Sequence, residues 1–264
     1  MLLTIDHLTI EFHDHALPET VVKDVNFALE EGEILGIVGE SGSGKSMTAL
    51  AVAGLLSRKD MTKTGRILFD GEELLSMKRA DLRKLQGNEI GMIFQEPMTA
   101  LNPTMKIGRQ VEEALRIHFD MTKEEQRRTA LEWLDKVELE DVERVYDSYP
   151  HELSGGMRQR IMIAAAMVSS PRLLIADEPT TALDVTVQAQ ILKLLRKINQ
   201  KNHTAIMFIS HDLSLVRQLC HRVIVMKDGC IVEEGECEDI FNAPSEDYTK
   251  RLIAAIPQIE ICKG

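Results

Sequence analysis

Apolar residues in the first third of the chain follow the pattern of β-strands. They alternate with polar residues over residues 3–12 and again at Val25, Phe27 and Leu29, which predicts half-buried strands. Residues 34–38 (ILGIV) form instead an unbroken apolar run that ends at a glycine-rich stretch. Such a run is typical of a strand buried on both faces of a parallel sheet.

The middle of the chain, from about residue 96 to residue 150, is charged and has a helical period. Ala130, Leu131, Leu134 and Val137 recur at three- and four-residue spacing and share one face of a helix, while the charged residues before them take the solvent side. We expect this segment to form a small helical subdomain.

An alternation of apolar strands and helices follows this segment. It predicts a parallel sheet covered by helices on both faces. The expected elements are strands at 173–177 and 205–210, helices at 188–201 and from Asp212, and two strands about Asp228–Gly229.

Charge and composition narrow the class of protein. The 264 residues are 44% hydrophobic and 28% charged, as in a soluble globular protein, and the formal net charge is −11. An acidic surface repels nucleic-acid phosphates and anionic lipid, so we expect no nucleic acid among the partners, although a small basic groove stays compatible with this charge. No apolar run reaches the roughly 18 residues of a membrane span, and the first residues do not have the pattern of a signal peptide.

The four cysteines lie in the last quarter of the chain and form no CxxC pair. We expect reduced thiols in a reducing compartment rather than a metal site. These cysteines are Cys220, Cys230, Cys237 and Cys262.

Residues 39–46 (GESGSGKS) fit the phosphate-loop pattern G-x-x-x-x-G-K-[ST]. By chance the pattern appears in about 1% of chains of this length. Here it also follows an apolar strand and precedes a helical segment, so its backbone N–H groups and the helix dipole are directed at a phosphate. Lys45 would contact the β- and γ-phosphates and Ser46 would bind Mg²⁺. The expected nucleotide-binding residues are Gly39, Ser41, Gly42, Gly44, Lys45 and Ser46.

Two carboxylates, Asp177 and Glu178, follow the apolar run 173–176. The carboxyl end of a parallel strand borders the crevice where ligands bind in such sheets. Asp177 is expected to hold Mg²⁺ through a water molecule, and Glu178 to orient and polarise the attacking water.

Residues 153–157 (LSGGM) supply a second candidate anion site. Ser154 is a natural helix N-cap, and Gly155 and Gly156 leave backbone N–H groups accessible. One γ-phosphate cannot easily contact both this segment and the phosphate loop of the same chain. Two chains that each contribute one half of the site would solve this problem.

These motifs together resemble the ABC-type ATPases over essentially the whole chain. LSGGM corresponds to the LSGGQ signature of that family, with Met157 in place of Gln. Gln95 matches the Q-loop, residues 181–184 (TALD) the D-loop with Asp184, and His211 the switch histidine. Phe12 resembles the aromatic residue that stacks on adenine.

The resemblance implies the fold, the cofactors and the partners. The fold would be α/β, a P-loop NTPase core with a mostly parallel sheet, an N-terminal antiparallel β subdomain and an inserted α-helical subdomain. One ABC ATPase domain would span 1–264, with its core at about 1–95 and 156–240, the helical subdomain at 96–155 and a tail at 241–264.

In this family two ATP molecules lie between head-to-tail subunits. The resemblance assigns catalytic roles to Glu178, His211 and Gln95 and the binding of Mg²⁺ to Ser46, Gln95 and Asp177. It implies two membrane permease subunits, an extracytoplasmic substrate-binding protein that acts indirectly, and a peripheral place on the cytoplasmic face of the cell membrane.

Three segments resemble the peptide and nickel importers of this family: 94–103, 149–160 and 176–190. Met157 is similar to the first of the two ATPase paralogues in these systems, so a heterodimer with a second paralogue is expected. Peptide-type subunits commonly continue into a cysteine-rich tail that can hold an iron–sulfur cluster, whereas this chain stops at Gly264 with Cys262 alone there. That ending favours a nickel or metal-chelate importer, with a dipeptide or oligopeptide importer as the alternative.

Two other classes fit less well. A soluble ABC ATPase of DNA maintenance carries a long insertion between the phosphate loop and the signature, but the interval from Gly39 to Ser154 has room only for a small helical subdomain. A P-loop kinase would not require the LSGGM segment.

Overall fold

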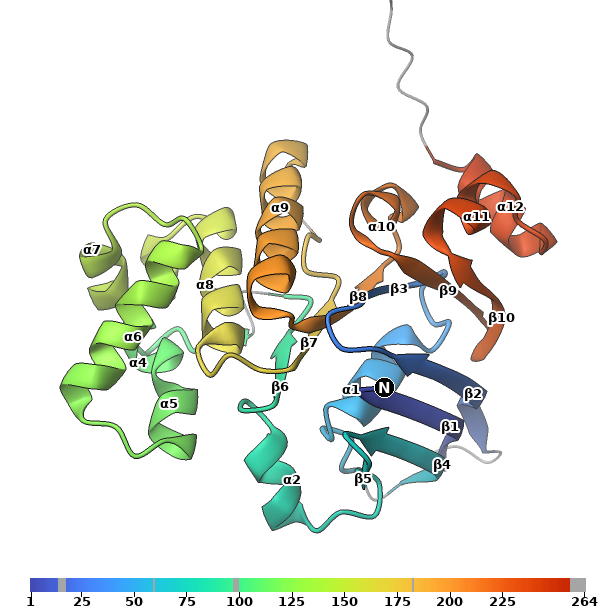
Figure 1. Ribbon diagram of the computed structural model, residues 1–264, viewed down its shortest axis with the longest axis horizontal. Coiled ribbons are helices and arrows are strands. Elements are labelled where there is room, and N and C mark those ends of the chain that lie inside the picture. Colours follow the sequence, from blue (N-terminus) through green and yellow to red (C-terminus); the bar gives the residue numbers. More distant parts are fainter. Residues whose placement is uncertain (14–17, 59, 97–99, 182, 257–264) are drawn as a thin grey trace, which may run out of the picture.

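The computed structural model describes residues 1–13, 18–58, 60–96, 100–181 and 183–256. Its larger sheet has six strands in the order β10-β9-β3-β8-β7-β6 (Figure 1). The pairs β9–β3, β3–β8, β8–β7 and β7–β6 are parallel, and β10 pairs antiparallel with β9. The strands are β3 (Ile34–Val38), β6 (Ile90–Ile93), β7 (Leu173–Asp177), β8 (Ala205–Ser210), β9 (Arg222–Lys227) and β10 (Cys230–Glu236).

The smaller sheet is antiparallel and has the order β2-β1-β4-β5. Its strands are β1 (Leu3–Phe12), β2 (Glu19–Leu29), β4 (Met61–Phe69) and β5 (Glu72–Glu73). The expected fold class, with an N-terminal antiparallel sheet and a mostly parallel core sheet, is therefore confirmed.

Side chains of the parallel strands alternate between two apolar cores. Val38 and Phe208 belong to the core that the sheet shares with α6, α8 and α9. Their neighbours Ile37 and Ile209 belong to the core shared with the antiparallel sheet and α1. Because successive side chains of a strand point to opposite faces, the unbroken apolar runs are explained by burial on both faces.

The helices from α4 to α8 gather at one end of the molecule (Figure 1). Thr122 and Glu125 form a capping box at the start of α6, and Trp133 and Leu134 in the same helix are buried. Of the helical face expected from the sequence, Ala130, Leu134 and Val137 are buried and Leu131 is partly buried, whereas the subdomain boundaries remain a prediction. The helices are α1 (Lys45–Val52), α2 (Arg79–Leu85), α4 (Ile107–Val111), α5 (Glu113–His118), α6 (Lys123–Lys136), α7 (Val142–Asp147), η1 (Pro150–Glu152), α8 (Gly155–Met167), α9 (Val185–Asn202), α10 (Leu213–Leu219), α11 (Cys237–Asn242) and α12 (Asp247–Ala254).

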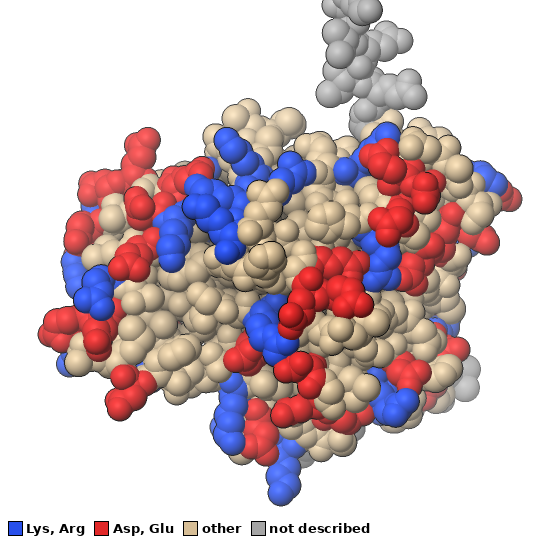
Figure 2. Space-filling model, viewed as in Figure 1, with Lys and Arg blue, Asp and Glu red and all other residues tan. Residues whose placement is uncertain are grey.

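Among the described residues, no helix is long and apolar enough to cross a membrane. Lys and Arg side chains are interspersed with Asp and Glu over the face in Figure 2. Cys220, Cys230 and Cys237 are free thiols. Cys262, residues 97–99 of the segment 94–103 and residue 182 of the D-loop lie outside the described residues.

Candidate nucleotide site

The phosphate loop connects β3 to α1 and has a backbone that requires glycine. Gly39 has φ 152°, and a Cβ atom there would lie 2.1 Å from the carbonyl oxygen of Met226 on β9. Gly44, at the N-cap of α1, has φ 99°, and a Cβ atom there would lie 2.8 Å from the carbonyl oxygen of Val21. Both positions are closed to larger residues because backbone atoms of neighbouring strands surround them.

Lys45, the first residue of α1, is buried with its ammonium group inside the loop. Its Nζ donates hydrogen bonds to the carbonyl oxygens of Gly39 and Glu40, each at 2.8 Å, and to the Ser43 hydroxyl at 3.3 Å. Burial lowers the pKa of Lys45, against the opposing effect of the nearby carboxylates Glu178 and Asp177. The loop therefore holds a desolvated positive charge, which favours an anionic ligand.

Ser46 and Asp177 bring two oxygen ligands together at the end of β7. The Ser46 hydroxyl donates to Asp177 Oδ1 at 3.0 Å. Burial raises the pKa of Asp177, which the hydrogen bond from Ser46 opposes. Adjacent hydroxyl and carboxylate oxygens fit a hard cation such as Mg²⁺, and positive charge there would stabilise the ionised carboxylate.

Glu178 is held by one side chain from its own turn and by side chains from two other connections. Its Oε2 accepts hydrogen bonds from Gln95 Nε2 and from the Thr181 hydroxyl, each at 2.9 Å, and lies 3.2 Å from His211 Nδ1. Its backbone is left-handed, with φ 48°, and its N–H donates to the carbonyl oxygen of Ile209. The structure thus brings together three of the predicted catalytic residues.

Thr181 is the member of this cluster that sequence reasoning missed as a partner of Glu178. The turn that follows Glu178 returns the Thr181 N–H to the Glu178 carbonyl oxygen at 3.2 Å, which brings the hydroxyl to the carboxylate. The three-residue spacing was the available signal, but the left-handed Glu178 that makes the turn has no marker in the sequence.

The signature segment forms a second group of residues at the start of α8. The Ser154 hydroxyl caps α8 by accepting from Met157 N at 3.3 Å. The glycines of the signature lie near the D-loop and the helix after it. A Cβ atom at Gly155 would be 3.9 Å from Leu183 of the D-loop, and one at Gly156 would be 3.1 Å from Val187 on α9. Asp184 caps α9 by accepting from Val187 N at 3.0 Å. The signature and the D-loop therefore pack against each other within one chain. Ser154 lies beside this contact and is exposed.

Phe12 ends β1 and is partly buried. The guanidinium carbon of Arg58 lies 5.0 Å from the centre of its ring, in the range of a cation–π contact. A stacking role on adenine stays a prediction.

This arrangement combines a glycine-dependent loop around a buried ammonium group, a hydroxyl beside a buried carboxylate, and a second carboxylate held by neighbouring side chains. The sequence model of the family described as ABC transporter matches residues 22–181. The chain belongs to the ABC transporter family. It is an ATPase whose hydrolysis of ATP is coupled to transport.

Relatives and solved structures agree with this membership. The dipeptide transport ATP-binding protein DppD of Escherichia coli is 45% identical over 257 residues, which cover 97% of this chain and 79% of that protein. The oligopeptide transport ATP-binding protein OppD of Bacillus subtilis is 47% identical over 260 residues, which cover 98% of this chain and 73% of that protein. The ATP-binding cassette MJ0796, a dimer solved with ADP and phosphate, superimposes with a TM-score of 0.81 at 31% identity, over 89% of this chain and 99% of that one.

The Gly39→Ala variant tests the phosphate cradle. We expect its affinity for ATP to fall at least about tenfold, because the added Cβ forces the loop away from Met226 and displaces the carbonyl that holds Lys45. Calorimetric titration with ATP measures the change.

Gly71→Ala is the matched control, because Gly71 has φ 81° and open space around a Cβ atom but lies outside the site. Equal losses of ATP affinity in both variants would contradict a specific role for Gly39.

Proposed function

We propose that the chain is the ATP-hydrolysing subunit of an importer of dipeptides or oligopeptides. The observation that carries this proposal is the similarity to DppD and OppD, the dipeptide and oligopeptide transport ATP-binding proteins, which are 45% and 47% identical over almost the entire chain. These names support the peptide alternative better than the nickel or metal-chelate importer that was the first expectation.

The geometry around Lys45 supports a mechanism for the binding step. Its buried ammonium group can exchange the carbonyl oxygens of Gly39 and Glu40 for phosphate oxygens of ATP, which are stronger hydrogen-bond acceptors. Ser46 and Asp177 would hold Mg²⁺, which when bound neutralises charge on the phosphates.

Glu178 is the group that orients the attacking water. In this structure its Oε2 is occupied by Gln95 and Thr181, with His211 beside it. Transfer of the Gln95 amide from Glu178 to the γ-phosphate side would free the carboxylate to accept the water proton. Gln95 is thereby a link between the state of the nucleotide and the helices that follow it in the chain.

The signature segment supports closure between two chains. Ser154, Gly155 and Gly156 are exposed or partly exposed at the start of α8, where N–H groups and the helix dipole favour an anion. We assign them to the γ-phosphate of ATP held by another chain. The other chain is a paralogous ATPase subunit, as the resemblance of Met157 and its surroundings to the first paralogue suggests.

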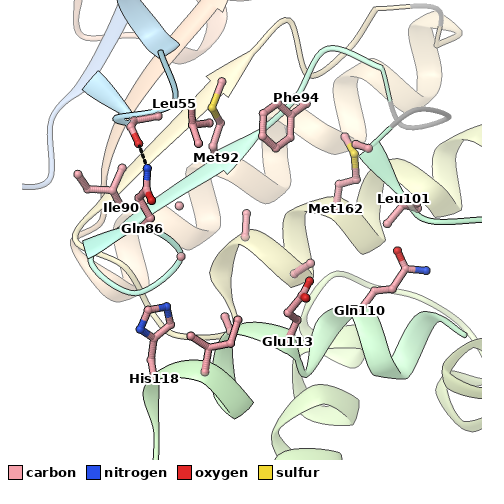
Figure 3. Close-up of a pocket in the computed structure, with 18 residues that line it drawn as sticks. Leu55, Gln86, Ile90, Met92, Phe94, Leu101, Gln110, Glu113, His118 and Met162 are labelled. Carbon is pink, nitrogen blue, oxygen red and sulfur yellow. Dashed lines mark hydrogen bonds between the residues drawn. The ribbon is translucent and has the colours of Figure 1, made fainter. Parts of the chain in front are cut away.

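A groove between the core sheet and the helices supports attachment to a membrane partner (Figure 3). Its volume is about 370 Å³, and Gln86, Met92, Leu101, His118 and Met162 are among the residues that line it. Two large apolar side chains at this groove, Phe94 and Ile117, are exposed by 43% and 64%. We assign the groove to a helix of a permease subunit, which would hold the chain peripherally at the cytoplasmic face of the membrane beside two permeases.

The Glu178→Gln variant tests the role of Glu178. We expect the rate of ATP hydrolysis to fall by about 10²- to 10⁴-fold, because the amide cannot take a proton from water, while ATP affinity is retained. Phosphate release measures the rate, and Glu132→Gln, an exposed substitution on α6, is the control. Hydrolysis within a fewfold of the unchanged protein would exclude Glu178 as the base.

The substrate class is tested on the whole transporter, purified with the subunits encoded beside it. We expect its ATPase rate to rise when its capture protein is loaded with dipeptide or oligopeptide, and to stay at the basal rate with Ni²⁺–chelator. Stimulation by the nickel complex alone would overturn the peptide assignment and leave the ATPase mechanism intact.

A further inference from the structure

The last helix of the described chain makes a direct hydrogen bond to the phosphate loop. The Tyr248 hydroxyl on α12 accepts a hydrogen bond from the Glu40 N–H at 3.1 Å. The Tyr248 side chain is buried, with 7% of its surface exposed, and burial raises the pKa of its hydroxyl, so it remains protonated at neutral pH. Its ring also lies near the end of β9, 5.3 Å from Lys227 Nζ.

This hydrogen bond and one of the two 2.8 Å hydrogen bonds of Lys45 act on one peptide group. The peptide that joins Gly39 to Glu40 presents its carbonyl oxygen to Lys45 Nζ at 2.8 Å and its N–H to Tyr248. A trans peptide is planar, and its C=O and N–H point in opposite directions. The two hydrogen bonds therefore hold the peptide group from opposite sides. Rotation of the peptide would break both contacts together.

α12 is itself anchored, so Tyr248 is a fixed support for this peptide. Glu233 on β10 accepts hydrogen bonds from the N–H and hydroxyl of Ser245, at 2.6 and 2.7 Å, just before the helix. Leu252 and Ile253 of α12 pack against the main apolar core. The position of Tyr248 is therefore set by the core sheet and is independent of the loop that it contacts.

We propose that Tyr248 is a positioning residue for ATP binding, which sets the orientation of the Gly39–Glu40 peptide and through it the conformation of the phosphate loop around Lys45. The C-terminal helix thereby keeps the phosphate loop in the conformation that receives the phosphates. A loop ordered in advance does not have to be ordered by ATP, so the contribution lies in affinity. Once ATP is bound, its own contacts hold the loop, and the chemical step proceeds as before.

The Tyr248→Phe variant removes the hydroxyl and keeps the ring. We expect the KM for ATP and the Kd for ADP to rise about three- to tenfold, because one hydrogen bond is lost. The kcat at saturating ATP is expected to change less than about twofold. The ATPase rate of the assembled transporter and calorimetric titration of the full chain with ADP measure these values. Lys250→Ala, an exposed substitution on the same helix, is the control and is expected to change neither.

The split between KM and kcat separates positioning from a merely structural role. Partial loss of folded protein would lower kcat in proportion to the active fraction and leave KM unchanged, and that result would overturn the proposal. Unchanged KM and Kd with an unchanged melting temperature would also overturn it. Raised KM and Kd with unchanged kcat support it, whichever substrate the transporter carries.

Discussion

The site depends on the buried ammonium group of Lys45. A cation taken out of water needs close acceptors, and here the carbonyl oxygens of Gly39 and Glu40 supply them at 2.8 Å. This requirement fixes the path of the loop around the first turn of α1. It also explains the glycine at position 39, where the β9 backbone leaves no space for a side chain. The same charge favours an anion, and we propose that the phosphates of ATP replace those acceptors.

The parallel sheet supplies the rest of the site around Lys45. β3, β6, β7 and β8 run in one direction, so the residues that follow each strand meet at one edge. The phosphate loop, Gln95, the Asp177–Glu178 pair and His211 all leave the sheet there. The carboxylate of Glu178 lies where these connections meet, because it contacts side chains from three of them. The signature at the start of α8 has exposed residues, and we propose that the nucleotide of another chain contacts it there.

Features encoded locally could be predicted from the sequence. The apolar run 34–38 and the glycine pattern after it define a buried strand and a phosphate loop without reference to any distant residue. Contacts made by the tertiary fold could not be predicted. The Tyr248–Glu40 hydrogen bond joins residues 208 positions apart, and Thr181 reaches Glu178 through a left-handed turn. The cargo is the feature that the sequence predicts least well, because ATP-binding residues serve the same chemistry whatever is carried. The names of the relatives match the peptide alternative better than the nickel importer that was expected first.

The central claim is that one chain holds half of each ATP site and needs the signature of another chain to complete it. The direct measurement is the ATPase rate per molecule of this chain over a wide range of concentration, alone and with the second ATPase subunit of the purified transporter. A rate per molecule that rises with subunit concentration and then saturates is the predicted result, because hydrolysis requires association. A measurable rate per molecule that stays constant down to the lowest concentration, with or without the second subunit, would contradict the claim.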